Sequence, residues 1–204
     1  MIEEMGGIIV GEASHTKQMI KKVLVSLCET QPFRKISVQQ IAQEAGINRQ
    51  TFYYHFTDKY DLLRWVYYED SLHYLKTESL SLDNWEEQAL LMLKAIAENK
   101  QFYSSTVSSE QEILQKQFSA LIQPSFIKIF EQMDEEKQLT SKDKLFYARF
   151  FSYGCSGVLV NWITQGYTET PLEVAMQFFR LAKDTELYSY RLYALEEEQE
   201  IKDE

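Results

Sequence analysis

The chain has 204 residues, of which 45% are hydrophobic and 14% aromatic, and its formal net charge is −10. This apolar content is enough for a large core, which excludes an intrinsically disordered chain. An acidic total argues against nucleic-acid binding only if the charge is evenly spread. Residues 14–64 carry eight Lys or Arg and four Asp or Glu, a net +4, whereas residues 1–13 carry −3 and residues 65–204 carry −11. A mildly basic segment therefore precedes an acidic body.

Residues 1–13 contain three glycines and three glutamates, with an apolar run from Ile8 to Val10 that is far too short for a signal peptide. We expect them to form a flexible arm. Cys28 and Cys155 lie in apolar segments that read as helices, which is typical of reduced thiols in a cytoplasmic protein. The alternative is a metal site that joins these cysteines to the three histidines. Since no pair has the spacing of metal ligands, we expect no metal and no cofactor.

The first helix is predicted from His15 to Glu29, with an apolar stripe at three- and four-residue spacing formed by Ile20, Val23, Leu24 and Leu27. A second helix begins after Ser37, where S-V-Q-Q has the spacing of a capping box. Gly46 follows at the place where this helix must stop and turn sharply. The pattern indicates two short helices joined by a glycine turn.

The helix after the turn is predicted from Arg49 to His55, with Asn48 as its N-cap and Phe52 and Phe56 facing inward. Its remaining positions offer hydrogen-bond donors beside aromatic hydroxyls, which suits the major groove of DNA and the flanking phosphates. These outward positions are Arg49, Gln50, Thr51, Tyr53, Tyr54 and His55. Helix-turn-helix patterns also occur in folded domains that never bind nucleic acid, so this interpretation has a purely structural alternative.

At these residues the chain resembles the TetR family of bacterial transcription regulators. The pattern IA-x-x-AG-I-x-x-x-T-[FL]-Y-x-[HY]-F-x-x-K-x-x-L is present without a gap, as Ile41, Ala42, Ala45, Gly46, Ile47, Thr51, Phe52, Tyr53, His55, Phe56, Lys59 and Leu62. The segments RQTFYYHF and LLRWVYYED, with a later W…FY pattern from Trp85 to Tyr103, resemble the branch that includes regulators of dihydroxyacetone kinase operons.

The resemblance implies that Gln39, Arg49, Gln50 and Thr51 face bases, and that a second group holds the sugar-phosphate backbone, namely Ser37, Tyr53, Tyr54, His55 and Lys59. With Asn48, these residues form the predicted DNA-binding surface. An arginine such as Arg49 can bond a guanine edge in bidentate fashion and a glutamine such as Gln50 an adenine edge. Lys59 lies in the first turn of the next helix, where free N–H groups and the helix dipole favour a phosphate.

The body of the chain is predicted to be helical throughout, because no alternating run is long enough for a strand. Asp58 caps a helix that extends to about Lys76, and further helices begin at Asp83-x-x-Glu86, Ser109-x-x-Glu112 and Thr170-Pro171-Leu172-Glu173. Pro124 is expected to kink or split its helix near Gln123. The prediction is an all-α fold of about nine or ten helices: a three-helix DNA-binding domain at 14–63, with its helix-turn-helix at 37–56, and a larger bundle for effector binding and dimerisation at 64–204.

The segment from Leu145 to Ile163 is apolar around its whole circumference, although Arg149 and Asn161 argue against a membrane span. Gly154 and Gly157 permit close backbone approach, either within one subunit or at a dimer seam. Helix-turn-helix proteins usually pair two heads on a palindromic operator, so we expect a homodimer. The family resemblance places the seam on the last two long helices, about 142–165 and 171–192.

The body contains more aromatic residues than a purely structural bundle needs, and some are expected to line an effector pocket. The candidates are Tyr68, Phe102, Tyr103, Phe118, Phe126, Tyr147, Phe151 and Trp162. Because the body is acidic, an aromatic or apolar effector is expected rather than a strong anion. The predicted function is a DNA-binding, ligand-responsive transcription regulator without enzymatic activity. The alternative is an adaptor that acts mainly through a partner protein.

Overall fold

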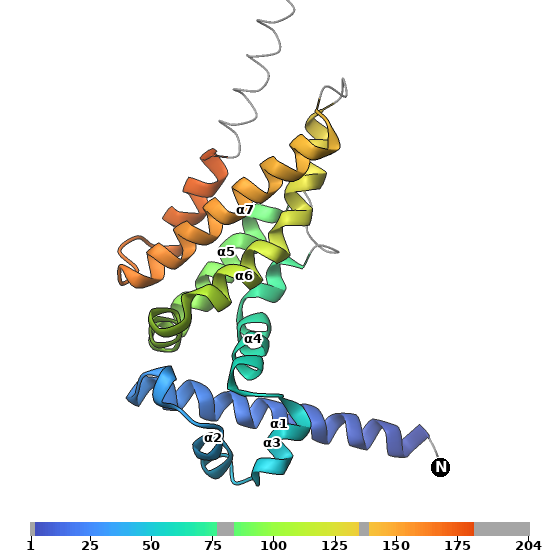
Figure 1. Ribbon diagram of the computed structural model, residues 1–204, viewed down its shortest axis with the longest axis vertical. Helices are drawn as coiled ribbons and strands as arrows, with labels where there is room; N and C mark the ends of the chain where they lie inside the picture. The colour runs from blue at the N-terminus through green and yellow to red at the C-terminus, as the bar shows by residue number, and fades with distance from the viewer. Residues whose placement is uncertain (1–2, 77–83, 135–138, 182–204) are drawn as a thin grey trace, which may run out of the picture.

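The computed structural model describes residues 3–76, 84–134 and 139–181, and every regular element in these ranges is a helix, as predicted. A smaller group of helices lies at one end of a larger bundle (Figure 1). We call residues 14–58 the head and the bundle that follows α4 the body. The elements are α1 (Glu3–Thr30), η1 (Phe33–Lys35), α2 (Val38–Glu44), α3 (Arg49–His55), α4 (Lys59–Asp70), η2 (Leu72–Leu75), α5 (Trp85–Glu98), α6 (Lys100–Met133), α7 (Ser141–Thr164) and a helix at 171–181.

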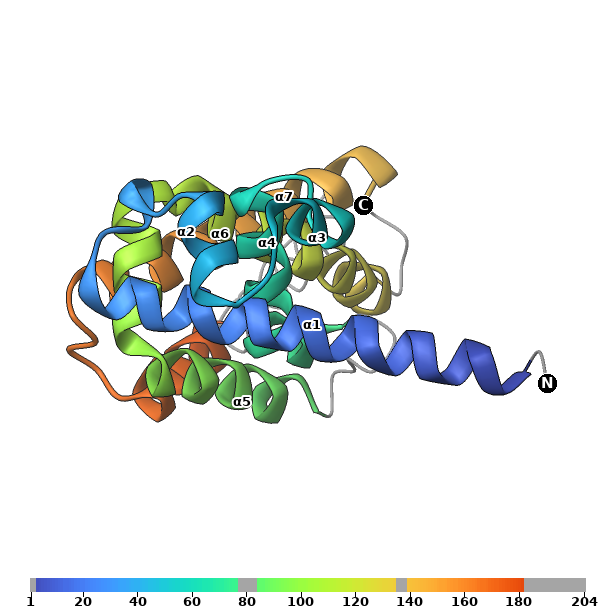
Figure 2. The ribbon, with the colours of Figure 1, turned by 90° about the horizontal axis from the view of Figure 1, so that it is seen from below.

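The first helix is longer than predicted, because α1 begins at Glu3 and not near His15. The flexible arm expected at residues 1–13 is therefore helical from residue 3 onward. Adding a residue to an existing helix fixes fewer dihedral angles per hydrogen bond than starting a new one, so a helix can extend through glycines that would not nucleate it. The N-terminal part of α1 projects beyond the other helices of the head (Figure 2).

The head packs around the apolar stripe of α1. Ile20 and Leu24 have no exposed surface, and they share one buried cluster with Ile41 of α2 and Phe52 of α3. The three- and four-residue spacing in the sequence thus predicted the face of α1 that the two short helices cover. Burial of these large side chains fixes α3 against α1 and leaves its opposite face in solvent.

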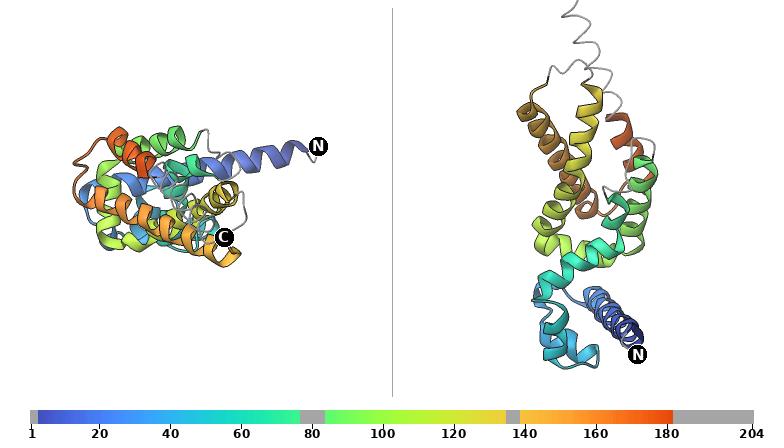
Figure 3. Two further views of the ribbon diagram at one scale, coloured as in Figure 1. Left: turned by 90° about the horizontal axis from the view of Figure 1, so that it is seen from above. Right: turned by 90° about the vertical axis from the view of Figure 1, so that its right-hand side faces the viewer.

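The helix that leads from the head into the body is α4. The Asp58 carboxylate accepts the N–H groups of Tyr60 and Asp61 at 2.8 and 2.7 Å, which confirms the predicted cap. α4 ends at Asp70 and not near Lys76 as predicted, since Ser71 leaves the helical conformation. The Ser71 hydroxyl bonds the Tyr103 hydroxyl of α6 at 2.8 Å, so a buried polar contact takes over where α4 ends. Figure 3 shows α4 rising from the head into the bundle.

The long helix α6 of the body consists of two helical parts that meet at a bend. α6 runs from Lys100 to Met133 and keeps helical backbone angles through Pro124, so the predicted break near Gln123 is wrong. Ala120, whose carbonyl loses its partner at this proline, is exposed, and water can satisfy that carbonyl. The break lies instead at Glu110, which has non-helical φ and ψ of −144° and 49°.

One predicted helix start in the body is found without its predicted cap. The Ser109 hydroxyl donates to the Ser105 carbonyl at 2.9 Å and does not cap the next turn, although the second part of α6 begins beside it, at the Glu110 break. α5 starts at Trp85, after Asn84, whose side chain makes no capping bond; Asp83 lies outside the described residues. The described ranges contain eight α-helices, or nine if α6 is divided at Glu110, against the nine or ten expected for the whole chain.

The C-terminal helices match their predicted starts. Thr170 and Glu173 form a reciprocal capping box, with Thr170 N–H to the Glu173 carboxylate at 2.7 Å and Glu173 N–H to the Thr170 hydroxyl at 3.2 Å. α7 begins after Thr140, which forms the same motif with Asp143. α6 and α7 lie antiparallel and side by side (Figure 1). No helix within residues 3–76, 84–134 and 139–181 is long and apolar enough to cross a membrane.

Candidate nucleic-acid interface

The turn between α2 and α3 is held by the residues that the sequence predicted. The Ser37 hydroxyl accepts the Gln40 N–H at 3.1 Å at the start of α2. Gly46 has a φ of +64°, a conformation that favours a residue without a Cβ, and Ile47 N–H closes the corner on the Ala42 carbonyl at 3.0 Å. The Asn48 side chain then accepts the Thr51 N–H at 2.7 Å and starts α3. This geometry is a helix-turn-helix.

One face of α3 is buried and the other is available for recognition. Phe52 is completely buried and Phe56 nearly so, whereas Tyr54 is 78% exposed. Arg49 and Gln50, in the first turn, are also exposed. Side chains in the N-terminal turn of a recognition helix are the ones that contact base edges in helix-turn-helix proteins.

Arg49 has a defined neighbour on this face. Its Nη2 donates to the Tyr53 hydroxyl at 3.3 Å, and its guanidinium lies 5.8 Å from the centre of the Tyr53 ring. The contact spans one helical turn and restricts the arginine before any ligand binds. The exposed Gln39 of α2 and the half-buried His55 of α3 complete the predicted surface. Burial and the nearby Lys17 ammonium lower the pKa of His55, which favours the neutral form of its imidazole.

The structure gives the Lys59 ammonium a different set of partners from those the sequence predicted. Its Nζ donates to the carbonyls of Phe33, Arg34 and Ile36 at 3.2, 3.0 and 2.9 Å, and it lies 4.7 Å from the centre of the Phe33 ring. An ammonium group has three hydrogens, so these carbonyls occupy its full donor capacity. Burial lowers the pKa of Lys59. Lys59 therefore ties the first turn of α4 to η1 rather than standing free for a phosphate.

The sequence analysis assigned no contact to two basic residues of the head, Lys17 and Arg34. The Lys17 ammonium of α1 lies 5.5 Å from the ring centre of Phe56 and 5.6 Å from that of Trp65. It therefore joins α1 to the end of α3 and to α4. The sequence does show that the head has a net positive charge. A total charge does not indicate which side chains the basic residues contact.

The eight aromatic residues predicted to line an effector pocket fall into separate packed clusters. Phe102 and Tyr103 pack on Tyr67, with Tyr103 stacked on it at a ring distance of 5.5 Å. Trp162 packs on Tyr167. A third cluster unites α6 and α7 and consists of Phe126, Phe130, Tyr147 and Phe151. Phe118 is buried and Tyr68 partly buried. Four of the eight are therefore buried core residues, whereas Tyr68, Phe126 and Phe151 are partly buried and Tyr147 is 37% exposed.

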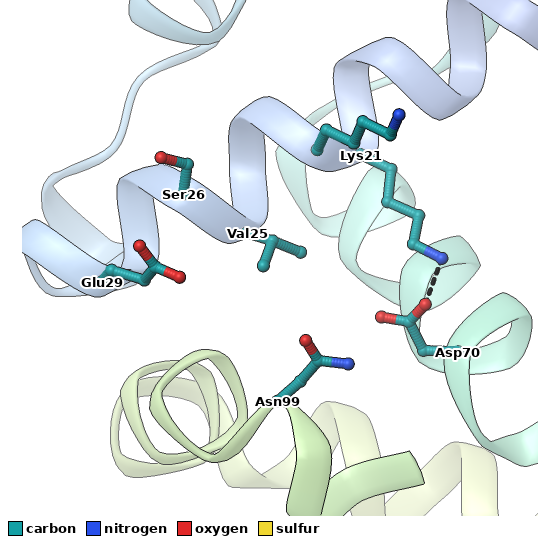
Figure 4. A pocket seen from close by; sticks show the side chains of 7 residues that line it. Lys21, Val25, Ser26, Glu29, Asp70 and Asn99 are labelled. Atoms are coloured by element: carbon teal, nitrogen blue, oxygen red, sulfur yellow. Dashed lines mark ion pairs between the residues drawn. The ribbon is translucent and has the colours of Figure 1, made fainter.

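A polar pocket lies elsewhere, between the head and the body. Its volume is about 410 Å³, and its lining comes from α1, the end of α4 and the junction of α5 and α6: Lys21, Lys22, Val25, Ser26, Glu29, Asp70 and Asn99. Figure 4 shows Val25 and Glu29 of α1 on the side of the helix toward Asn99, beside the ion pair between Lys21 and Asp70. None of the eight predicted aromatic residues lines this pocket. Two lysines and two acids leave it without a strong net charge.

The described ranges contain no group of three or more His, Cys, Asp or Glu side chains placed to hold a metal ion. Burial raises the pKa of both the Cys28 and the Cys155 thiol to about 12. Both cysteines are free thiols. The thiolate form that binds metals is therefore strongly disfavoured at both positions.

The fold and its exposed α3 define a helix-turn-helix DNA-binding protein. Comparison with known families agrees: residues 22–66 match "Bacterial regulatory proteins, tetR family", and residues 83–184 match "Transcriptional regulator C-terminal region" of a TetR type. The chain belongs to the TetR family of bacterial transcription regulators.

Individual relatives support a narrower likeness. The chain is 34% identical over 88 residues to the HTH-type dhaKLM operon transcriptional activator DhaS of Lactococcus lactis, a match that covers 43% of this chain and only 46% of that protein. A solved structure of the dihydroxyacetone kinase operon activator DhaS is similar with a TM-score of 0.62 and 25% identity, over 83% of this chain and 95% of the other. The predicted likeness to regulators of dihydroxyacetone kinase operons is confirmed. The fatty acid degradation regulator FadR of Bacillus halodurans shares the fold, with a TM-score of 0.55 and 14% identity over 81% of this chain and 93% of the other.

Proposed function

We propose that this protein is a homodimeric, sequence-specific transcription regulator that binds a palindromic operator through α3 and acts in the cytoplasm. The observation that carries the proposal is α3 itself: a capped helix whose inner face is buried and whose outer face presents Arg49, Gln50 and Tyr54 to solvent. The basic head also suits DNA, while the acidic body is repelled by the polyanion and so favours one orientation.

Dimerisation is supported by the surface of α7. Phe146, Phe150 and Tyr153 recur at four- and three-residue spacing and are 53%, 64% and 61% exposed. Among the residues that the structure describes, a Cβ added at Gly154 or Gly157 would meet no atom within 4 Å, so neither glycine serves a close approach to another described part of the subunit. An exposed apolar stripe with small residues beside it is a surface on which a second copy of the same helix can pack closely.

The second candidate is an adaptor that keeps the DNA-binding head but acts mainly through a partner protein. The two readings differ in whether the purified protein suffices. We expect the protein alone to shift its own promoter DNA in a gel, with affinity that falls steeply as salt rises. A shift that appears only after a second protein is added would favour the adaptor.

Base readout is assigned to the first turn of α3. We expect Arg49→Ala and Gln50→Ala each to reduce discrimination between operator and altered operator by about 1–3 kcal/mol at one base position. Binding to unrelated DNA should change little. The measurement is a fluorescence anisotropy titration with single-base operator variants. Gln43→Ala, at an exposed position of α2 outside the predicted surface, is the matched control; an equal loss there would contradict the assignment.

Control by a small molecule is the last part of the proposal. The pocket of Figure 4 is lined mainly by residues with charged or polar side chains, whereas the predicted aromatic residues contribute none of its lining, so we place a polar effector between head and body. With dihydroxyacetone as the polar probe and indole as the aromatic one, we expect only the former to alter DNA affinity. Asn99→Leu should remove the response and Phe126→Leu should keep it. A response to indole that Phe126→Leu removes would instead support the aromatic clusters.

A further inference from the structure

The short helix η1 joins the head to α6. The N–H of Phe33 donates to the Ser105 hydroxyl of α6 at 3.2 Å, and that hydroxyl contacts the Gln31 carbonyl at 3.4 Å. The carbonyls of η1 are held from the other side by Lys59, in the first turn of α4. α4 follows directly after the recognition helix. A displacement of α6 at Ser105 can therefore reach α3 through a short series of hydrogen bonds, by way of η1, Lys59 and the start of α4.

Arg34 is the charged part of this junction. Its Nε donates to Glu110 Oε1 at 3.1 Å, and its Nη2 donates to the Ser109 carbonyl at 2.8 Å. The two bonds come from one guanidinium and reach adjacent residues of α6, so they fix both its position and its direction. The Glu110 side chain is 25% exposed and that of Arg34 70% exposed, so the pair lies at the surface, where it can open without unfolding the core.

Glu110 is also the residue at which α6 leaves helical geometry. The cause lies in the sequence just before it, SSTVSS at 104–109. The Thr106 hydroxyl donates to the Phe102 carbonyl at 2.8 Å and the Ser109 hydroxyl to the Ser105 carbonyl at 2.9 Å. Hydroxyls that bond carbonyls one turn back compete with the backbone N–H groups and bend helices. The hinge of α6 and the contact with the head therefore coincide.

We propose that Arg34 and Glu110 are positioning residues: the latch formed by the Arg34 guanidinium, the Ser109 carbonyl and the Glu110 carboxylate sets the orientation of the DNA-reading head at the hinge of α6. This inference rests on the proposed function. α6 packs along α7, so a change in the body that straightens or bends α6 at Glu110 pulls on Arg34 and, through η1 and Lys59, on α4. Opening the latch frees the head without removing any residue of its DNA-binding face.

The test measures the orientation of the head directly. Spin labels at Glu44→Cys on α2 and Lys94→Cys on α5, both exposed positions, report the distance between head and body within one chain. Labelled protein is diluted with unlabelled protein, so that a second copy adds no distances. The native thiols label slowly, because burial raises the pKa of each to about 12.

We expect Arg34→Gln and Glu110→Gln to broaden the distance distribution, the first more strongly since it removes both latch bonds. Glu112→Gln is the matched control: it removes a carboxylate two residues further along α6 whose partner, Lys116, lies on the same helix. The exchange Arg34→Glu with Glu110→Arg should narrow the distribution again. Unchanged distributions in the two latch variants, or equal broadening in Glu112→Gln, would overturn the proposal.

DNA affinity supplies the second readout. A head that samples more orientations loses more entropy when DNA fixes it in one of them. We therefore expect both latch variants to bind operator about threefold to fivefold more weakly at an unchanged melting temperature. A lower melting temperature with an unchanged distance distribution would indicate a merely structural pair and overturn the proposal. If the parent protein binds no DNA, the proposed function fails, while the distance measurement still tests the latch.

Discussion

Replacing Phe150 and Tyr153 by glutamate is expected to separate the dimer into monomers and to weaken operator binding by about 100-fold or more. Both side chains are more than 60% exposed on α7, so the change disturbs little inside one subunit, yet it places two charges in the proposed seam. The loss in affinity follows because a monomer binds one half-site and forgoes the high effective concentration of the second head.

Sedimentation velocity gives the oligomeric state of this double variant, and anisotropy titrations with the whole operator and with one half-site give the affinities. Gln132→Glu, at an exposed position of α6, adds an acidic charge to the body without touching α7 and is the control for charge alone. A double variant that stays dimeric would place the seam elsewhere on the surface.

Lys59→Met is expected to lower the free energy of unfolding by about 1.5–3 kcal/mol, because hydrogen bonds from a charged group to the carbonyls of Phe33, Arg34 and Ile36 are lost together. The methionine keeps the length of the apolar stem over the Phe33 ring. The slope of log affinity against log salt should stay close to that of the parent, since the ammonium has no donor left for a phosphate.

Urea denaturation and salt titrations of DNA binding check the two halves of this prediction. Lys35→Met, an exposed neighbour in η1, removes a charge from the same region and should leave stability within about 0.5 kcal/mol. If Lys59→Met instead kept full stability and reduced the salt slope by about one, the phosphate contact implied by the family resemblance would be right.

Most of the head was predictable because its signals are local. The bounds of α3 follow from Asn48, which caps the helix from within the same turn, and the turn at Gly46 needs only one residue with positive φ. Such features depend on neighbours in the sequence and so can be read from it. The starts of α4 and of the helix at 171–181 were predicted for the same reason.

The differences between the sequence predictions and the structure concern features that depend on distant partners. The sequence contains the Ser and Thr residues before the bend of α6, but the proline rule placed a break near Pro124, where the residue one turn earlier, Ala120, is exposed to water. Lys59 has the right position for a phosphate, and only the fold brings the carbonyls of η1 to it. An aromatic residue that fills a core and one that lines a cavity have the same helical spacing. The sequence alone therefore could not show that Phe102 and Trp162 are core residues.

The path of α4 has a consequence for how the protein folds. The domain boundary predicted at residues 63–64 lies inside this helix, and the side chains on either side of it, Leu62, Leu63, Val66 and Tyr67, have no exposed surface and belong to one continuous cluster. Cutting the chain there would expose that cluster on both fragments. We therefore expect head and body to unfold as a single cooperative unit, so that a destabilising substitution deep in the body also lowers the free energy of unfolding of the DNA-binding head.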